Sequence, residues 1–119
     1  MNNLNSVLIE GNMVREPQFQ TGAKVTPICN FSIESVRFYR HEDNMVRDTD
    51  YFSIEARGKL AETCSKYGRK GRGVRIVGRL KQDRLNGNDE NNQSIFFIIA
   101  EHIEFRPQQE KENLLDFEG

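Results

Sequence analysis

The stretch G-K-L-A-E-T-C-S-K-Y-G, residues 58–68, decides the fold, because the spacing of apolar residues changes there. Within it the apolar side chains recur at the intervals of one helical stripe, at Leu60, Ala61, Cys64 and Tyr67. Gly68 follows the last of them, and glycine is a common residue just beyond a helix C-terminus. The sequence therefore predicts one short helix over residues 59–67.

On both sides of this helix the apolar period is two, which is typical of half-buried strands. Three strands are predicted before the helix and two after it, at residues 6–14, 29–34, 51–57, 74–81 and 94–105. Residues 38–50 are polar and aromatic and are predicted to form a hairpin loop with its tip near Asp43 and Asn44. Asn86-Gly87 marks a second turn, which residues 88–93 extend into a loop.

Three strands, a helix and two strands follow the order of an OB-fold barrel. We therefore predict an all-β protein, a five-stranded OB-fold barrel with one short helix between strands 3 and 4 that covers one end. An open sheet with one helix is less favoured, because it would leave strand edges unprotected.

Charge divides the chain into two parts. Residues 1–107 hold sixteen basic and fourteen acidic side chains, a net charge of +2. Residues 108–119 hold one lysine and four acids, a net charge of −3. We predict a single domain over residues 1–107, followed by a short acidic C-terminal tail.

Eight of the seventeen basic residues fall within residues 66–84, which contain one acid, Asp83. Apolar residues thread through this run, so it is predicted to be a strand with basic side chains on a fixed surface. Alternation places Arg75, Arg79 and Lys81 on the face opposite Val74, Ile76 and Leu80. Such a surface favours a polyanion. A basic strand edge that prevents aggregation is the competing interpretation.

Besides the basic residues, the sequence contains aromatic side chains that are predicted to be exposed. Tyr51 alternates with the apolar positions of its strand, which predicts that it lies outside the core. Phe38 and Tyr39 are flanked by Arg37 and Arg40, an interleaving of ring and charge. Positive charge together with exposed rings is the combination that binds unpaired nucleic acid strands.

Several other functions are disfavoured. Cys29 and Cys64 form no metal-ligand spacing and are interpreted as buried free thiols, which fits a reducing compartment. His41 and His102 lie in no metal motif, and no nucleophile arrangement is visible. We predict no enzyme activity, no metal and no cofactor. The first residues do not resemble a signal peptide, and no apolar run reaches membrane-spanning length, so a cytoplasmic protein without membrane contact is expected.

Four segments resemble bacterial single-stranded DNA-binding proteins, in that family's order and spacing. They are S-V-L-I-E-G-N-M-V-R-E-P at residues 6–17, N-F-S-I-E at 30–34, G-K-L-A-E at 58–62 and R-K-G-R-G-V-R-I-V-G-R-L at 69–80. The resemblance implies an OB-fold that assembles as a homotetramer. It also implies a nucleoid-associated protein that coats single strands during replication, recombination and repair.

The chain departs from this family at its aromatic positions. It contains no Trp, whereas the family stacks bases on several aromatics. Phe38 or Tyr39 and Tyr51 match two of those positions, Arg57 replaces a third, and the fourth falls near Arg84 and Leu85. Arginine can itself stack on a base.

The tail departs as well, because the family's tail ends on a phenylalanine with a free carboxylate that partner proteins bind. Here Glu118 and Gly119 follow Phe117. The resemblance implies that replication and repair proteins contact Leu115, Asp116 and Phe117, without a free carboxylate on the phenylalanine. The alternative is a module like primosomal replication protein N, a related dimeric barrel that lacks most stacking aromatics and acts through protein partners.

The residues expected to bind DNA are basic or aromatic and lie on the predicted ribbon, the helix start and the basic run. They are Arg37, Phe38, Tyr39, Arg40, Arg47, Tyr51, Arg57, Lys59, Lys70, Arg72, Arg75, Arg79, Lys81 and Arg84.

Overall fold

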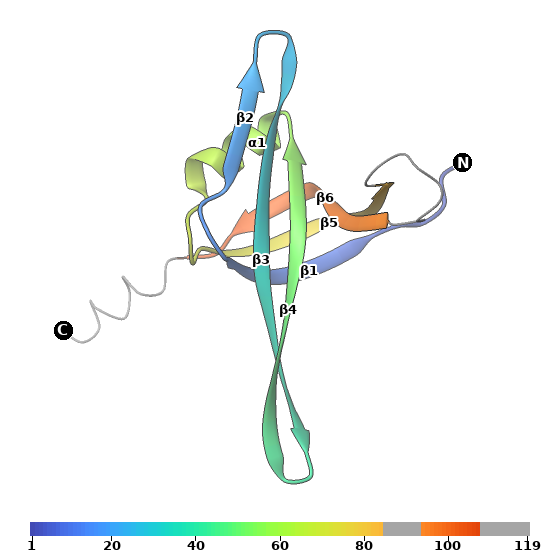
Figure 1. Cartoon of the computed structure of the whole chain (residues 1–119), viewed down its shortest axis with the longest axis vertical. Coiled ribbons are helices and arrows are strands. Elements are labelled where there is room, and N and C mark those ends of the chain that lie inside the picture. The colour runs from blue at the N-terminus through green and yellow to red at the C-terminus, as the bar shows by residue number, and fades with distance from the viewer. Residues whose placement is uncertain (85–93, 108–119) are drawn as a thin grey trace, which may run out of the picture.

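A computed structural model describes residues 1–84 and 94–107, apart from the side chain of Arg84. Its elements are β1 (Val7–Met13), β2 (Gln18–Gly22), β3 (Val25–His41), β4 (Asn44–Arg57), α1 (Lys59–Tyr67), β5 (Gly73–Arg84) and β6 (Ser94–Phe105). Figure 1 shows β3 and β4 crossing the layer of β1, β5 and β6. The turn predicted at residues 86–93, Leu85 and the tail at 108–119 lie outside the described residues.

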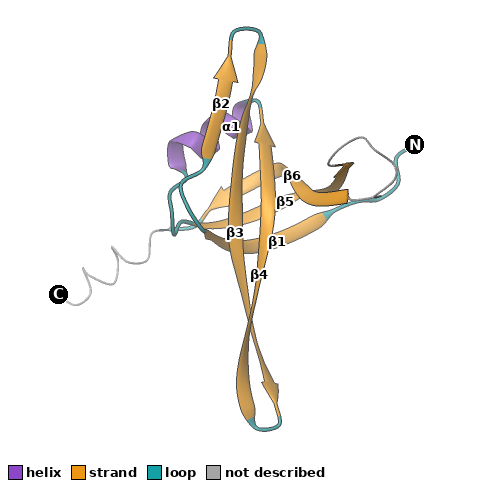
Figure 2. Ribbon diagram, in the orientation of Figure 1, coloured by secondary structure: helices purple, strands orange, loops and turns teal. Residues whose placement is uncertain are grey.

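Five strands close into a barrel. The sheet runs in the order β1-β5-β6-β4-β3-β2, and β1 also pairs with β3, through Asn12 with Glu34 and Met13 with Ile33. The pairings are antiparallel except for that of β4 with β6, which is parallel. The all-β prediction of a five-stranded OB-fold barrel with one short helix is confirmed, and the helix has the predicted bounds (Figure 2).

The core takes one face of each barrel strand and one stripe of α1. Alternate residues of β3, Cys29, Phe31 and Ile33, are buried, as the period of two predicted. From α1, Ala61 and Cys64 enter the same core cluster, so the helix covers this part of the barrel. Cys29 and Cys64 are both free thiols, and their mutual hydrogen bond and burial raise the pKa of Cys64 well above its usual range.

The polar segment predicted as a loop is instead a long two-stranded ribbon. β3 and β4 remain paired out to His41 and Asn44, and the tip is at Glu42 and Asp43. Both tip residues have positive φ, 48° and 68°, as a two-residue type I′ hairpin turn requires. The ribbon extends beyond the barrel at one end (Figure 1). The loop prediction was wrong because strands that leave the core lose the alternation of apolar and polar residues.

Two further corrections concern strand positions. β2 was not predicted; all five of its residues are exposed, so burial left no period in its sequence. Leu80 was predicted to face the core but is 46% exposed. The register of β5 against β6 shifts after Val77, where Gly78 pairs with Ala100, so a β-bulge bends the ribbon near the last buried position. Past Gly78 no described residue of β5 is buried, and Leu80 is exposed although its partner on β6, Ile98, stays in the core.

Candidate nucleic-acid interface

The side of the β3–β4 ribbon that faces away from the core is called the outer ribbon face. Strand register places side chains in directly opposed pairs on it. The pairs are Asn30 with Glu55, Ser32 with Ser53, Glu34 with Tyr51, Val36 with Thr49, Phe38 with Arg47 and Arg40 with Met45, and Arg57 extends the face at the end of β4. It therefore carries two aromatic rings and three arginines on a framework fixed by backbone pairing.

Tyr51 lies where the alternation of its strand predicted. Its side chain is 64% exposed on the outer ribbon face, whereas its neighbour Phe52 is partly buried against the core. An exposed tyrosine on a paired strand offers a flat apolar surface whose position is already fixed. This ring can stack on a base with little loss of conformational entropy.

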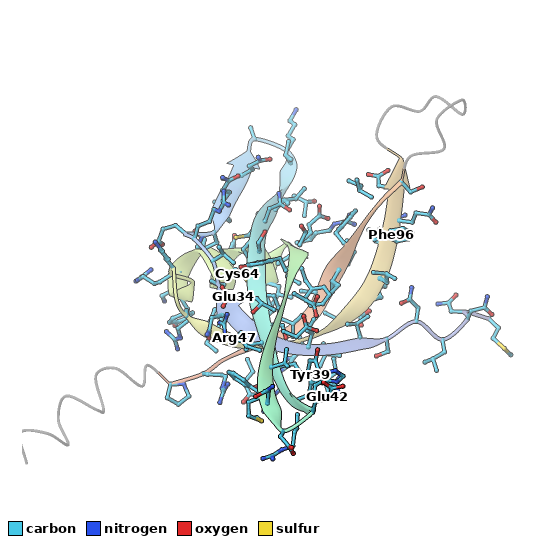
Figure 3. The ribbon with its side chains drawn as sticks, turned by 60° about the horizontal axis from the view of Figure 1, so that its bottom comes forward. Glu34, Tyr39, Glu42, Arg47, Cys64 and Phe96 are labelled. Atoms are coloured by element: carbon cyan, nitrogen blue, oxygen red, sulfur yellow. The ribbon has the colours of Figure 1, made fainter. Side chains whose placement is uncertain are left out.

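Phe38 and Tyr39 belong to opposite faces of the ribbon. Phe38 pairs with Arg47 and shares the outer ribbon face with Tyr51, and its side chain is 61% exposed. Tyr39 pairs with Val46 and lies on the other face, with Arg37 and Asp48 as the next pair (Figure 3). The structure therefore brings Phe38, and not Tyr39, onto the same face as Tyr51.

Two arginines of the outer ribbon face are held by carboxylates of the same face. Arg47 Nη2 lies 3.1 Å from Glu34 Oε1, a pair that links β4 to β3 (Figure 3). Arg57 Nε lies 2.5 Å from Glu55 Oε2, two residues earlier on β4. Neither glutamate was singled out from the sequence.

A groove of about 740 Å³ crosses the outer ribbon face at its barrel end. Its floor includes Asn30, Ser32 and Ser53, and one wall is formed by Arg15, Glu16 and Gln18 ahead of and in β2. The opposite wall comes from the β5–β6 ribbon, with Phe96 58% exposed. In OB-folds, oligonucleotides bind at this location, across the second and third barrel strands, which are β3 and β4 here. The loops between the first and second strands and between the fourth and fifth strands lie on either side.

The groove reveals residues that the sequence-based prediction omitted. Arg15 and Phe96 line it, yet neither is on the predicted list. Phe96 belongs to the strand predicted at residues 94–105, in which no aromatic residue was proposed to bind DNA. β6 lies between β5 and β4 but pairs with β4 only at Ile98 and Ile99, and the earlier residues Ile95 and Phe96 are exposed. Exposed rings in such a strand give no sequence signal.

The basic run does not join the outer ribbon face as one track. Arg75 donates to Glu10 Oε2 from Nε and Nη2 at 2.9 and 2.8 Å, and Arg106 reaches Glu10 Oε1 at 3.0 Å. The hydrogen bond from Arg75 and the charge of Arg106 lower the pKa of Glu10. Arg79 lies 3.8 Å from Glu101. Arg75 and Arg79 lie on the layer formed by β1, β5 and β6, where acids of neighbouring strands offset their charge.

The remaining predicted residues are dispersed. Arg72 donates to the carbonyl of Arg106 and lies over the Phe105 ring, near the start of β5. Lys59 is exposed at the start of α1, and Lys70 is exposed between α1 and β5. Lys81 is exposed near the end of β5, and the side chain of Arg84 is outside the described part.

Within residues 1–84 and 94–107, no three His, Cys, Asp or Glu side chains are placed to hold a metal ion. In the same part of the chain no helix is long and apolar enough to cross a membrane.

A sequence model of the single-strand binding protein family matches residues 4–106. The chain belongs to this family.

Individual relatives agree with this assignment. Single-stranded DNA-binding protein 2 of Chlorobaculum tepidum is 34% identical over 121 residues, which cover the whole of this chain and 82% of that protein. The single-stranded DNA-binding protein of Caldanaerobacter subterraneus subsp. tengcongensis is 25% identical over 126 residues, covering 97% of this chain and 83% of that protein.

Solved structures share the fold. The Plasmodium falciparum SSB in its complex with ssDNA superposes with a TM-score of 0.77 at 24% identity, over 90% of this chain and 98% of that one. A deletion mutant of the single-stranded DNA binding protein from Thermus aquaticus also gives a TM-score of 0.77, at 20% identity, over 89% of this chain and 52% of that one.

Proposed function

We propose that this member of the family binds single-stranded DNA without sequence preference, along the outer ribbon face and through its groove. The observation that carries the proposal is that the groove lies at the barrel end of the same ribbon face on which Tyr51 and Phe38 are exposed. Tyr51 and Phe38 stack on bases, and Arg40, Arg47 and Arg57 contact phosphates or stack through their guanidinium groups. Bases that stack on flat side chains need no particular hydrogen-bond pattern, which explains the absence of sequence preference.

The other predicted basic residues support binding in a second way. A strand that continues past the groove meets Lys81 near the end of β5, and a contact with Arg84 remains a prediction from the sequence. Residues on other parts of the surface contact only a strand that wraps around the protein: Arg37, Tyr39, Lys59, Lys70, Arg72, Arg75 and Arg79. Where Lys59, Lys70 and Arg72 make no contact, their charge still attracts the polyanion over a Debye length.

In the cell this binding would coat and protect single strands in DNA replication, recombination and repair. Family members act by binding, and we propose no catalytic step for this chain. The working location is the nucleoid within the cytoplasm. Residues 1–107 form the DNA-binding domain, and the acidic tail at 108–119 contacts replication and repair proteins through Leu115, Asp116 and Phe117.

Salt dependence tests the proposed function. If about five basic side chains each neutralise one phosphate, log K for a single strand should change with log salt with a slope of about −3.5. Affinity for a labelled thymine oligonucleotide should then fall about 100-fold between 50 and 200 mM salt. Fluorescence anisotropy measures this directly, with a duplex of equal length as the control. Tighter binding to the duplex, or binding that salt does not alter, would refute the proposal.

We also expect a homotetramer. β1 pairs with β3 only at Asn12 and Met13, so within the described part of the chain the edge at residues 7–11 is free to pair with another strand. Leu8 on this strand is 72% exposed, and Ile95 and Phe96 add apolar surface elsewhere. Multi-angle light scattering at micromolar concentration should give four times the chain mass. A monomer would contradict this expectation, and a dimer would favour the module that resembles primosomal replication protein N.

A further inference from the structure

The outer ribbon face contains two ion pairs, each formed by one glutamate and one arginine. Glu34 pairs with Arg47 and Glu55 pairs with Arg57. Arg40 adds one further positive charge near the tip of the ribbon. In the free protein, two of the three arginines on this face are therefore already occupied by an anion.

The two ion pairs flank the centre of the face. The opposed serines Ser32 and Ser53 lie in the groove floor, and the Asn30–Glu55 and Glu34–Tyr51 pairs lie immediately on either side of them. Glu55 lines the groove, and Glu34 lies directly opposite Tyr51. A strand stacked on Tyr51 would therefore bring its phosphates close to both carboxylates.

We propose that Glu34 and Glu55 compete with DNA phosphate for Arg47 and Arg57, and thereby hold the affinity of this face below what its arginines could provide. This inference rests on the proposed function. When a strand binds, a phosphate oxygen replaces a carboxylate oxygen as the partner of each guanidinium. The displaced glutamate then lies near the sugar-phosphate backbone of the DNA, and its negative charge repels the phosphates. Both effects oppose binding.

The fold does not depend on these ion pairs. The side chains of Glu34 and Arg47 are 33% and 57% exposed, and those of Glu55 and Arg57 are 17% and 50% exposed. The ribbon is held by its continuous backbone ladder from residues 28 to 57, and exposed ion pairs add little to stability. Glutamine has nearly the shape of glutamate, so Glu34→Gln and Glu55→Gln remove the charge and leave the backbone pairing in place.

Binding of a thymine oligonucleotide to the full chain tests the inference, with circular dichroism to confirm folding. At 50 mM salt each Gln variant should bind about two- to fivefold more tightly than the unmodified protein, as expected for release of one exposed ion pair. The gain should shrink at 300 mM salt, where such pairs are screened. The matched control is Glu62→Gln, which changes net charge equally but lies exposed on α1, and its affinity should stay close to that of the unmodified protein.

A double-mutant cycle separates competition from general charge. In an Arg47→Gln background, Glu34→Gln should give a smaller gain than it gives in the unmodified protein, because the competition for Arg47 is already absent and only the repulsion of phosphate is removed. Equal gains in the presence and absence of Arg47 would overturn the inference, as would unchanged affinity in both single variants. Weaker binding of either Gln variant to the thymine oligonucleotide would also overturn it, because it would mean that the glutamates position the arginines for DNA. If the unmodified protein bound no single strand, the proposed function would fail as well.

Discussion

Replacing Phe38 and Tyr51 together by alanine is expected to weaken single-stranded DNA binding by about 2–6 kcal/mol, because each stacked base contributes about 1–3 kcal/mol. Both rings are exposed, so the double variant should keep its fold and its melting temperature. Tyr51→Ala alone should account for about half of the loss. Anisotropy titration with a thymine oligonucleotide at fixed salt measures the change.

Two controls show whether the outer ribbon face is responsible. Tyr67→Ala removes an exposed tyrosine from α1, whose ring packs 5.9 Å from that of Phe105, and should leave DNA affinity unchanged. Phe52→Ala removes the ring next to Tyr51 on the core side and should lower the free energy of unfolding with little effect on affinity once folding is controlled. Greater loss of binding in Phe52→Ala than in Tyr51→Ala would mean that the two faces of β4 have been interchanged.

Gly78→Ala is expected to lower the free energy of unfolding by about 3 kcal/mol, the upper range for overpacking a tight site. A Cβ atom at this position would lie 2.3 Å from the carbonyl oxygen of Ile99 and 2.9 Å from Ile98 Cγ2. The first contact is with backbone, so relief requires β5 and β6 to separate beside the bulge between Val77 and Gly78. Urea denaturation monitored by circular dichroism measures the loss.

The matched control for this substitution is Gly22→Ala. A Cβ atom there meets nothing nearer than Val25 Cγ2 at 4.0 Å, and β2 is exposed throughout. Its free energy of unfolding should change by no more than about 0.5 kcal/mol. Equal stability of the two variants would show that β5 and β6 do not approach as closely at Gly78 as the structure indicates.

The parts of the fold that could be predicted from sequence are those whose burial leaves a period. Helix α1 and strand β6 have the predicted bounds, and Cys29, Phe31 and Ile33 face the core as expected. β2 and the outer half of the β3–β4 ribbon were missed because both of their faces are exposed. Their strand conformation comes from backbone pairing, and in the β3–β4 ribbon also from the turn at Glu42 and Asp43, which alternation does not record.

Only those features of the candidate site that depend on alternation within a single strand could be predicted from the sequence. Tyr51 was placed correctly because its own strand sets its parity. The interpretation of the basic run failed to include acids that are close in space but distant in sequence. Glu10 is 65 residues from Arg75, and Glu101 comes from a different strand than Arg79. Which acid faces which arginine depends on strand register between elements, and local spacing contains no information about that register.

The central claim is that unpaired bases lie on the outer ribbon face, and photo-crosslinking tests it most directly. A thymine oligonucleotide carrying 5-iodouracil should be bound to the full chain, irradiated, digested with protease and analysed by mass spectrometry to locate the crosslinked residues. Crosslinks are expected at Tyr51 and Phe38, and at Phe96 where the strand passes through the groove. Crosslinks confined to Tyr67, Phe105 or β1, with Tyr51 and Phe38 unmodified, would contradict this account.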